Sequence, residues 1–222
     1  MQAAKIDAGI SSWWGQNSET DLAFPKLLQA AAGTSFKWAI YYELDQDGSR
    51  PQTAVNADLR YIKTRYANDP SYLKVNGKPV VFIYAPNGTC ATARKWQRVK
   101  NQQGFYTSMI DVDSWWQDCP HAMDSWHQYR PDLPVAAVTL DERLYSVSVS
   151  AGFWAAWEAS SRLERNFETW KYVVDFMNSY PFEWQLVYFN EWGEGSGIEP
   201  SNAQCQVAGC RDYINVLGAH HP

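Results

Sequence analysis

The most informative stretch of this sequence is Tyr188–Pro200, which reads YFNEWGEGSGIEP. It overlaps the end of an apolar run, Trp184–Phe189, whose composition predicts a β-strand. Directly after that run come two glutamates, Glu191 and Glu194, with Trp192 between them. Cleavage of a glycosidic bond commonly needs two carboxyl groups in different protonation states, and an aromatic ring offers a sugar a stacking surface. The stretch therefore indicates carbohydrate chemistry, although two acids at this spacing can also be the solvated first turn of a helix.

On either side of this stretch, apolar strand-like runs alternate with amphipathic helix-like runs. Strands are expected at 6–13, 36–42, 79–84, 105–110, 123–129, 134–140 and 184–189, and helices at 21–32, 53–66, 91–100, 164–179 and 204–217. Such alternation indicates a parallel sheet covered by helices. About seven strands come close to the eight of a (β/α)8 barrel. We therefore expect an α/β fold of the TIM-barrel type, formed as a single domain by residues 1–222.

Catalytic residues of such barrels stand at the carboxyl ends of the strands. Acidic and aromatic side chains do collect at the expected strand ends, namely Trp13, Trp14, Tyr42, Glu43, Tyr84, Asp111, Asp113, Trp126, His127, Asp141, Glu142, Asn190, Glu191 and Glu194. Successive side chains of a strand point to opposite faces, so we expect one of Trp13 and Trp14 to face the core and the other a ligand.

Several of these residues also have an ordinary structural interpretation. Glu43 can pair with Arg50 on the surface, and His127 can be a buried histidine with its hydrogen bonds satisfied inside the core. Asp111 and Asp141 can cap the turns that follow them. The sequence leaves these alternatives open.

Composition narrows the classes of partner. The net charge of −5 argues against nucleic acid, whose binding needs a basic face, and is compatible with a neutral polysaccharide. No apolar run is long enough to span a membrane. The chain has 12 tryptophans and 13 tyrosines, an excess that serves either core packing or the stacking of flat ligands. The sequence gives no indication of the oligomeric state.

Four cysteines, Cys90, Cys119, Cys205 and Cys210, lie in loop-like sequence. An even number of loop cysteines suits two disulfides in an exported protein, so we expect a secreted, extracellular location. Bridges between Cys90 and Cys119 and between Cys205 and Cys210 are the pairing to test, because spacing alone leaves free thiols open. No pair has the CxxC spacing of a zinc site.

Four segments resemble, in the same order, glycoside hydrolase family 99, the endo-α-mannosidase and endo-α-mannanase group. They are GISSWWG at 9–15, the strand at 36–43, DPSYLKVNGKPVVFIY at 69–84 and, most specifically, the stretch at 189–200. The resemblance covers most of the chain and is weak from Asp111 to Ser160. It implies a (β/α)8 barrel that hydrolyses α-mannosidic bonds within chains, with retention.

The resemblance also implies roles for individual residues. Glu191 would deprotonate the 2-hydroxyl of the sugar, which attacks C1 to give an anhydrosugar, and Glu194 would protonate the leaving group and then activate water. Substrate contacts are expected from Trp13, Trp14, Tyr42, Glu43, His127, Asp141, Asn190 and Trp192. Neither a metal nor another cofactor is expected.

Members of this family have a further strand before the one that carries the Trp-Trp-Gly motif. This sequence shows no such run before residue 6, so we expect an incomplete or minimal barrel. A natural minimal form, a fragment and a strand supplied by another chain all remain open. Two alternative functions also remain open: a non-catalytic carbohydrate-binding protein and an α-glucan hydrolase of similar architecture.

Overall fold

The computed structural model describes residues 1, 4–112, 114–201, 209 and 211–220. The chain divides into two compact units, which are described separately. The N-terminal unit is Asp7–Trp126, and the C-terminal unit combines Met1–Ile6 with His127–Pro222. The expectation of a single domain over residues 1–222 stays a prediction.

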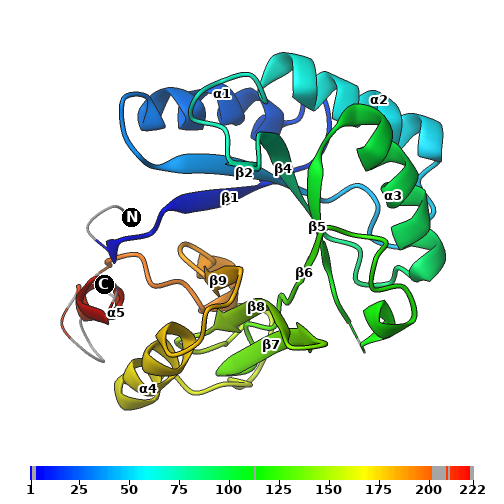
Figure 1. Cartoon of the computed structure of the whole chain (residues 1–222). Coiled ribbons are helices and arrows are strands. Elements are labelled where there is room, and N and C mark those ends of the chain that lie inside the picture. The colour runs from blue at the N-terminus through cyan, green and yellow to red at the C-terminus, as the bar shows by residue number, and fades with distance from the viewer. Residues whose placement is uncertain (2–3, 113, 202–208, 210, 221–222) are drawn as a thin grey trace. The chain divides into compact units, whose positions relative to one another are not determined.

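A mainly parallel sheet forms the centre of the N-terminal unit, with the strand order β1-β2-β4-β5-β6 and with β3 paired to β4. Its strands are β1 (Ala8–Trp13), β2 (Lys37–Tyr42), β3 (Lys74–Val75), β4 (Lys78–Ile83), β5 (Tyr106–Ile110) and β6 (Ser125–His127). The β1–β2, β2–β4 and β4–β5 pairs are parallel, whereas β3 and β4 are antiparallel. Helices α1 (Glu19–Ala31), α2 (Gln52–Arg65) and α3 (Cys90–Gln103) lie along one face of this sheet, and the short helix η2 (Trp115–Asp118) follows β5 (Figure 1).

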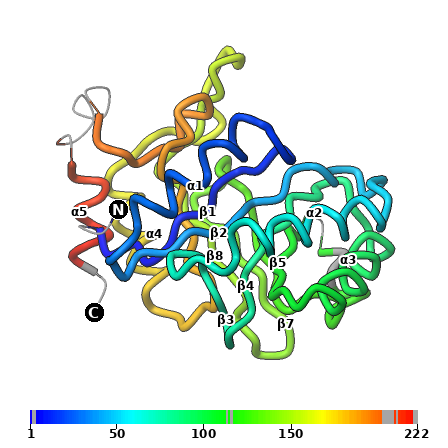
Figure 2. The backbone as a smooth tube through the Cα atoms, turned by 90° about the horizontal axis from the view of Figure 1, so that it is seen from above, coloured from blue at the N-terminus to red at the C-terminus, as the bar shows by residue number. Residues whose placement is uncertain are grey.

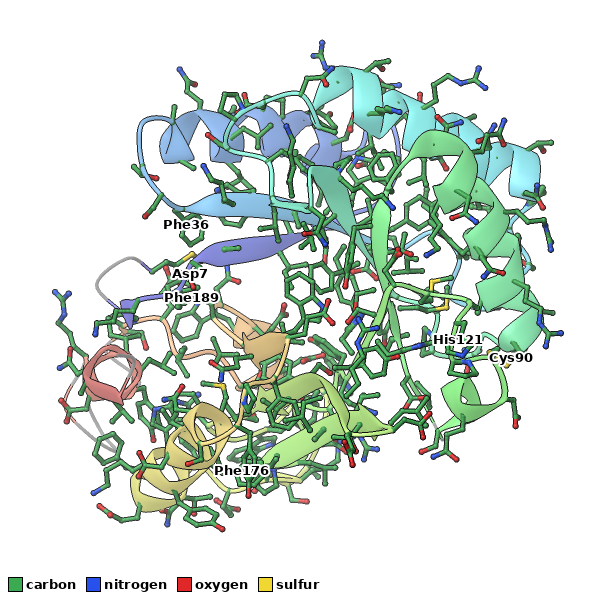
Figure 3. The ribbon with its side chains drawn as sticks, viewed as in Figure 1. Asp7, Phe36, Cys90, His121, Phe176 and Phe189 are labelled. Carbon is green, nitrogen blue, oxygen red and sulfur yellow. A yellow bond between two sulfur atoms is a disulfide. The ribbon has the colours of Figure 1, made fainter. Side chains whose placement is uncertain are left out.

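Local side-chain chemistry fixes where these helices begin and end. The Ser18 side chain caps α1 by accepting a hydrogen bond from the Asp21 amide at 3.2 Å. Thr89 and Thr92 form a reciprocal capping box at the start of α3, and Gly104, with a φ of 77°, ends that helix. Cys90, labelled in Figure 3 at the first residue of α3, forms a disulfide with Cys119. That expected bridge is confirmed.

The second expected bridge, between Cys205 and Cys210, lies outside the described residues. In the described ranges, no helix is both long and apolar enough to cross a membrane.

The C-terminal unit is built on a three-stranded sheet of order β7-β8-β9. Its strands are β7 (Val135–Leu140), β8 (Arg143–Val149) and β9 (Trp184–Val187), and its helices are α4 (Phe167–Asn178), η3 (Trp192–Glu194) and α5 (Asp212–His220). The β7–β8 pair is antiparallel, and β8 runs parallel to β9. Helix α4, which connects β8 to β9, packs against β8 and lies beside α5 (Figures 1 and 2).

Apolar side chains of α4 form the centre of the C-terminal core. Trp170, Val173, Val174 and Met177 recur at helical spacing and are all buried. They pack in one cluster with residues of β8 and α5, and the partly buried Phe176 and Phe189, labelled in Figure 3, lie against that cluster. This packing fixes β9, and therefore the start of the loop that follows it.

One part of the C-terminal sheet differs from expectation. A strand at 134–140 was expected to end at Asp141 and Glu142 like the strands of a parallel barrel, but these two residues form a hairpin turn, both with positive φ, and lead into the unexpected strand β8. Because β7 is antiparallel to β8, this turn lies at the amino end of β8, opposite the edge where β9 ends. The expectation that Asp141 and Glu142 end a barrel strand is therefore wrong, and a substrate contact by Asp141 stays a prediction.

Candidate active site

The loop that follows β9 is closed at its base by backbone hydrogen bonds. The Ile198 amide donates to the Phe189 carbonyl at 2.9 Å, and the Glu199 amide donates to the same carbonyl at 2.8 Å. Within the loop, residues Trp192–Glu194 form the 3-10 helix η3. Residues Asn190–Gly197, called the glutamate loop below, therefore form a compact unit that presents Glu191 and Glu194 at the carboxyl edge of β9.

A second segment, Phe153–Glu158, is hydrogen-bonded to the glutamate loop. The Trp154 amide donates to the Glu194 carbonyl at 2.9 Å, and the Ala156 amide donates to the Gly193 carbonyl at 2.8 Å. Gly195 has a φ of 62°, and a Cβ there would lie 3.0 Å from the Trp154 carbonyl oxygen. Only glycine fits without strain at this close approach.

Arg165 holds the other side of the glutamate loop. Its Nη2 donates to the carbonyl oxygens of Gly195 at 2.9 Å and Gly197 at 2.6 Å. The guanidinium also lies over the Tyr213 ring, 4.8 Å from its centroid, which ties the arginine to α5. The position of Glu194 thus depends on contacts from two segments that are distant in the sequence.

Glu194 is half-buried, and its carboxylate accepts a hydrogen bond from the Tyr129 hydroxyl at 2.9 Å. Burial raises the pKa of Glu194. The Tyr129 hydrogen bond and the charge of Arg162 act in the opposite direction, the charge of Asp132 adds to the rise, and the net pKa is above the usual glutamate value. The carboxyl group therefore keeps its proton to a higher pH than an exposed glutamate does.

Glu191 is also half-buried, and burial followed by the negative charge of Glu194 raises its pKa. The two carboxyl groups therefore titrate as an interacting pair, in which ionisation of one opposes ionisation of the other. At intermediate pH such a pair holds one proton between two carboxylates. This is the arrangement that allows one group to act as an acid while the other acts as a base.

Two tyrosines lie beside Glu194. The rings of Tyr129 and Tyr188 meet edge to face, with centroids 5.2 Å apart, and the Tyr188 hydroxyl accepts a hydrogen bond from the Arg130 amide at 2.9 Å. Burial, followed by the charges of Glu191 and Glu194, raises the pKa of Tyr129 well above its ordinary value. Tyr129 is therefore a protonated hydrogen-bond donor at every physiological pH.

Comparison with known proteins adds information on the fold. No family model and no curated protein sequence matches this chain. Two solved structures match 99% of it: the GH99 endo-alpha-mannosidase from Bacteroides thetaiotaomicron, with 19% identity, a TM-score of 0.72 and 75% of that chain covered, and a complex of the GH99 endo-alpha-mannosidase from the same organism with bis-tris-propane, with 18% identity, a TM-score of 0.74 and 80% covered. The chain has a GH99-like fold. The expected α/β fold of TIM-barrel type is confirmed, and so is the family resemblance at the level of the fold.

Three further residues that the sequence predicts to contact a substrate lie in the C-terminal unit. Asn190 and Trp192 are exposed on the glutamate loop, and the Trp192 indole N–H donates to the Glu199 carboxylate at 3.0 Å. His127 is buried, and burial lowers its pKa to about 3, so its imidazole is neutral. Substrate contacts by these residues stay predictions.

The aromatic candidates of the N-terminal unit separate into core and surface. Trp13 is fully buried and its indole N–H donates to Asp21 at 2.6 Å, whereas Trp14 is 51% exposed. The expectation that one of the two faces the core is confirmed. A stacking role for Trp13 is wrong because no face of its ring is accessible, and such a role for Trp14 stays a prediction.

The polar candidates of the N-terminal unit are also largely enclosed. Tyr42 is buried and its hydroxyl donates to Asp58 at 2.7 Å, so its predicted contact with a substrate is wrong. Arg50 pairs with Asp58 at 2.7 Å, not with Glu43. Glu43 is buried and accepts a hydrogen bond from the Ser12 hydroxyl at 2.8 Å, and its contact with a substrate stays a prediction.

Sequence reasoning missed four residues around the glutamate loop: Tyr129, Trp154, Trp157 and Arg165. Trp154 and Trp157 fall within the part of the chain where the family resemblance is weak. Their signal was the presence of two tryptophans in a segment without helical or strand periodicity. Arg165 carries no local signal, because its role depends on tertiary contacts with two carbonyl groups.

Proposed function

We propose that this protein is an endo-acting, retaining glycoside hydrolase that cleaves an α-linked, mannose-containing polysaccharide or glycan. The observation that carries the proposal is the coupled pair Glu191 and Glu194, both half-buried and both with raised pKa, on a loop whose Glu194 accepts a hydrogen bond from Tyr129. Binding alone does not require two interacting carboxyl groups. Acid–base chemistry at a glycosidic oxygen does.

The two glutamates take complementary roles in this proposal. Glu191 accepts the proton of the sugar 2-hydroxyl while that oxygen attacks C1, and Glu194 donates its proton to the leaving oxygen, so the glycosidic bond breaks and a 1,2-anhydrosugar forms. Glu194, now a carboxylate, then takes a proton from water as the water oxygen attacks C1. The C1–O2 bond breaks, and the 2-oxygen recovers its proton from Glu191. Both glutamates return to their starting states.

These steps require that the proton of the glutamate pair resides on Glu194 when substrate is bound. In the free protein, Tyr129 and Arg162 stabilise negative charge on Glu194, and that charge raises the pKa of Glu191. The proposed roles need the opposite assignment when substrate is bound. Hydrogen bonding of the sugar 2-hydroxyl to Glu191 favours its charged form, and the proton then resides on Glu194. Titration of the two glutamates is therefore expected to lower kcat/KM on both the acidic and the basic side of its pH optimum.

A glycan outside the cell is the proposed substrate, and the protein is proposed to be secreted. The Cys90–Cys119 disulfide supports this location, because disulfides persist in oxidising compartments. The two solved structures that this chain resembles are of an endo-alpha-mannosidase, which supports an α-mannoside over other substrates. An α-glucan remains the alternative substrate.

A non-catalytic carbohydrate-binding protein is the second candidate function. Three tryptophans on or beside the glutamate loop favour it: Trp154, Trp157 and Trp192 are 57%, 73% and 47% exposed. Aromatic surfaces of this kind bind sugars without any need for acid–base groups. The coupled glutamates are the feature that this second candidate leaves unexplained.

The deciding experiment measures release of reducing ends from a panel of α-mannans and α-glucans. The native protein is compared with Glu194→Gln, and with Glu183→Gln as the matched control, since Glu183 is an exposed glutamate before β9. We expect release by the native protein and by the control, and a loss of about 10²–10⁴-fold in Glu194→Gln, the range typical for removing a general acid.

Each other outcome has a distinct meaning. Release from glucan alone identifies an α-glucan hydrolase. Binding to a polymer without release of reducing ends favours the non-catalytic candidate. Equal release by the native protein and Glu194→Gln would contradict the role of Glu194.

A further inference from the structure

Two exposed tryptophans beside the glutamate loop have no role in the proposed chemistry. Trp154 is 57% exposed and Trp157 is 73% exposed, and only two residues lie between them in the chain. Single exposed apolar residues are common, but two exposed indoles on one short segment form a concentrated aromatic surface. Such a surface is a candidate site for binding a ligand.

The segment that carries these indoles is held against the glutamate loop. Two backbone hydrogen bonds, Trp154 to Glu194 and Ala156 to Gly193, join the segment and the loop at 2.9 and 2.8 Å. Backbones linked in this way lie about 5 Å apart. A sugar that contacts Trp154 or Trp157 is therefore within a few sugar units of the carboxyl groups.

The segment is also braced, and the Trp154 indole is held in position. The Trp154 indole N–H donates to the Glu158 carbonyl at 3.0 Å. Arg162 pairs with the Glu158 carboxylate at 2.8 Å, and its guanidinium lies 4.3 Å from the centroid of the Phe153 ring. Because these contacts already restrict the segment, a ligand has little ordering entropy to overcome when it binds there.

We propose that Trp154 and Trp157 form a secondary sugar-binding platform, which holds a pyranose unit of the same α-linked chain outside the pair of units that Glu191 and Glu194 act upon. The inference rests on the proposed function. A pyranose ring presents an apolar C–H face that suits the flat indole, and the charged groups of Glu158 and Arg162 at the edge of the platform can hydrogen-bond with hydroxyls. We assign a polysaccharide as the occupant because the platform is hydrogen-bonded to the glutamate loop.

The test uses a ladder of α-linked mannose and glucose oligosaccharides of increasing length. The native protein is compared with Trp154→Ala, Trp157→Ala and the double variant. Tyr172→Ala is the matched control, because Tyr172 is 71% exposed on α4 of the same unit. We expect the double variant to lose about tenfold or more in kcat/KM on long substrates and little on the shortest one, since only long chains reach the platform.

Binding measurements separate failure of the platform from failure of the proposed function. If the native protein releases no reducing ends but binds long oligosaccharides, loss of that binding in the double variant supports the platform even though the proposed hydrolysis is contradicted. If hydrolysis occurs and the double variant keeps the native dependence on chain length, the platform is overturned and the proposed function stands. Absence of sugar binding by the native protein overturns both.

A second copy of this chain is the other occupant that the experiment resolves. The molar mass in solution is measured for the native protein and the double variant by light scattering. A change from dimer to monomer with unchanged oligosaccharide affinity would overturn the sugar platform. Unchanged molar mass together with weakened binding of long oligosaccharides supports it, and unchanged melting temperatures show that the exposed substitutions leave the fold intact.

Discussion

The two units of this protein enclose carboxyl groups in opposite ways. In the N-terminal unit, Asp21 is buried, and burial by itself raises its pKa. Hydrogen bonds outweigh that effect and lower the pKa below the usual aspartate value; they come from Tyr66, Trp13, Asn17 and Tyr61. In the C-terminal unit, Glu191 and Glu194 are half-buried, and burial raises the pKa of each of them.

Part of the difference lies in the number of hydrogen-bond donors that each carboxylate accepts from. The Asp21 carboxylate accepts from two tyrosine hydroxyls, an indole N–H and a backbone amide, at distances of 2.6 to 2.8 Å. Glu194 accepts from the Tyr129 hydroxyl at 2.9 Å, and its negative charge raises the pKa of Glu191. A carboxylate surrounded by donors stabilises the folded state at neutral pH, whereas a carboxylate that keeps its proton is available for acid–base chemistry.

Removing the Asp21 carboxylate, which accepts several hydrogen bonds, is expected to have the largest effect on stability. Asp21→Ala leaves several buried donors without an acceptor, each at a cost of about 1–3 kcal/mol, so we expect the free energy of unfolding to fall by about 3–5 kcal/mol. Urea titration at neutral pH measures the change. Glu19→Ala is the control, because Glu19 is an exposed acid in the same first turn of α1.

The pH dependence of this variant follows from the lowered pKa. A carboxyl group whose pKa is depressed by folding adds stability above its unfolded-state pKa, and that stability is lost as the pH falls through the folded-state pKa. The difference in stability between native protein and Asp21→Ala should therefore shrink on acidification below the ordinary aspartate pKa of 3.8. A difference that grows toward acidic pH would contradict the assignment.

An intermediate effect is expected from substitution of Arg165, the arginine that positions the glutamate loop. In Arg165→Lys, an ammonium group on a shorter side chain replaces the guanidinium whose Nη2 donates to both the Gly195 and the Gly197 carbonyls, so the loop loses one of its supports. We expect kcat to fall about 10- to 100-fold with the fold retained, because small displacements of a catalytic group cost this much. Steady-state kinetics, with circular dichroism as the folding check, measures the effect.

Arg143→Lys is the matched control for this substitution. Arg143 begins β8 at the opposite edge of the same sheet, and its ion pair with Glu183 is largely exposed. Its replacement should leave kcat unchanged. Equal losses in the two variants would show that the contacts of Arg165 have no particular role in positioning Glu194.

Local patterns predicted much of the fold. The apolar runs and helical spacings identified α1, α2 and α3 of the N-terminal unit and four of its strands near their observed bounds, because these elements carry their own periodicity and caps. The strand β8 was missed because its small serines, Ser146 and Ser148, are buried like its valines, and the turn at Asp141 and Glu142 lacks the usual glycine. That omission placed Asp141 at the wrong edge of the sheet.

The candidate site was predictable only in part, for a related reason. Glu191 and Glu194 could be found because they lie three positions apart directly after a strand. Their surroundings could not, because Tyr129 is 65 positions from Glu194 and Arg165 reaches the loop from 30 positions away. Nothing local in the sequence distinguishes Tyr42, which is enclosed with Asp58, from Tyr129, which donates to a candidate catalytic acid.

The smallest expected effect has the opposite sign to that of Asp21→Ala. Folding raises the pKa of Glu191, so its charged form is disfavoured in the folded state, and Glu191→Gln removes that charge. We expect a melting temperature slightly higher than native at neutral pH, together with loss of hydrolysis, the usual exchange of stability for function at an active site. As the pH falls through the raised pKa, native Glu191 becomes neutral and the advantage of the variant should disappear. Thermal melts across this pH range measure the effect. A Glu191→Gln variant that is less stable than the native protein at neutral pH would show that hydrogen-bond donors stabilise the Glu191 charge in the folded state.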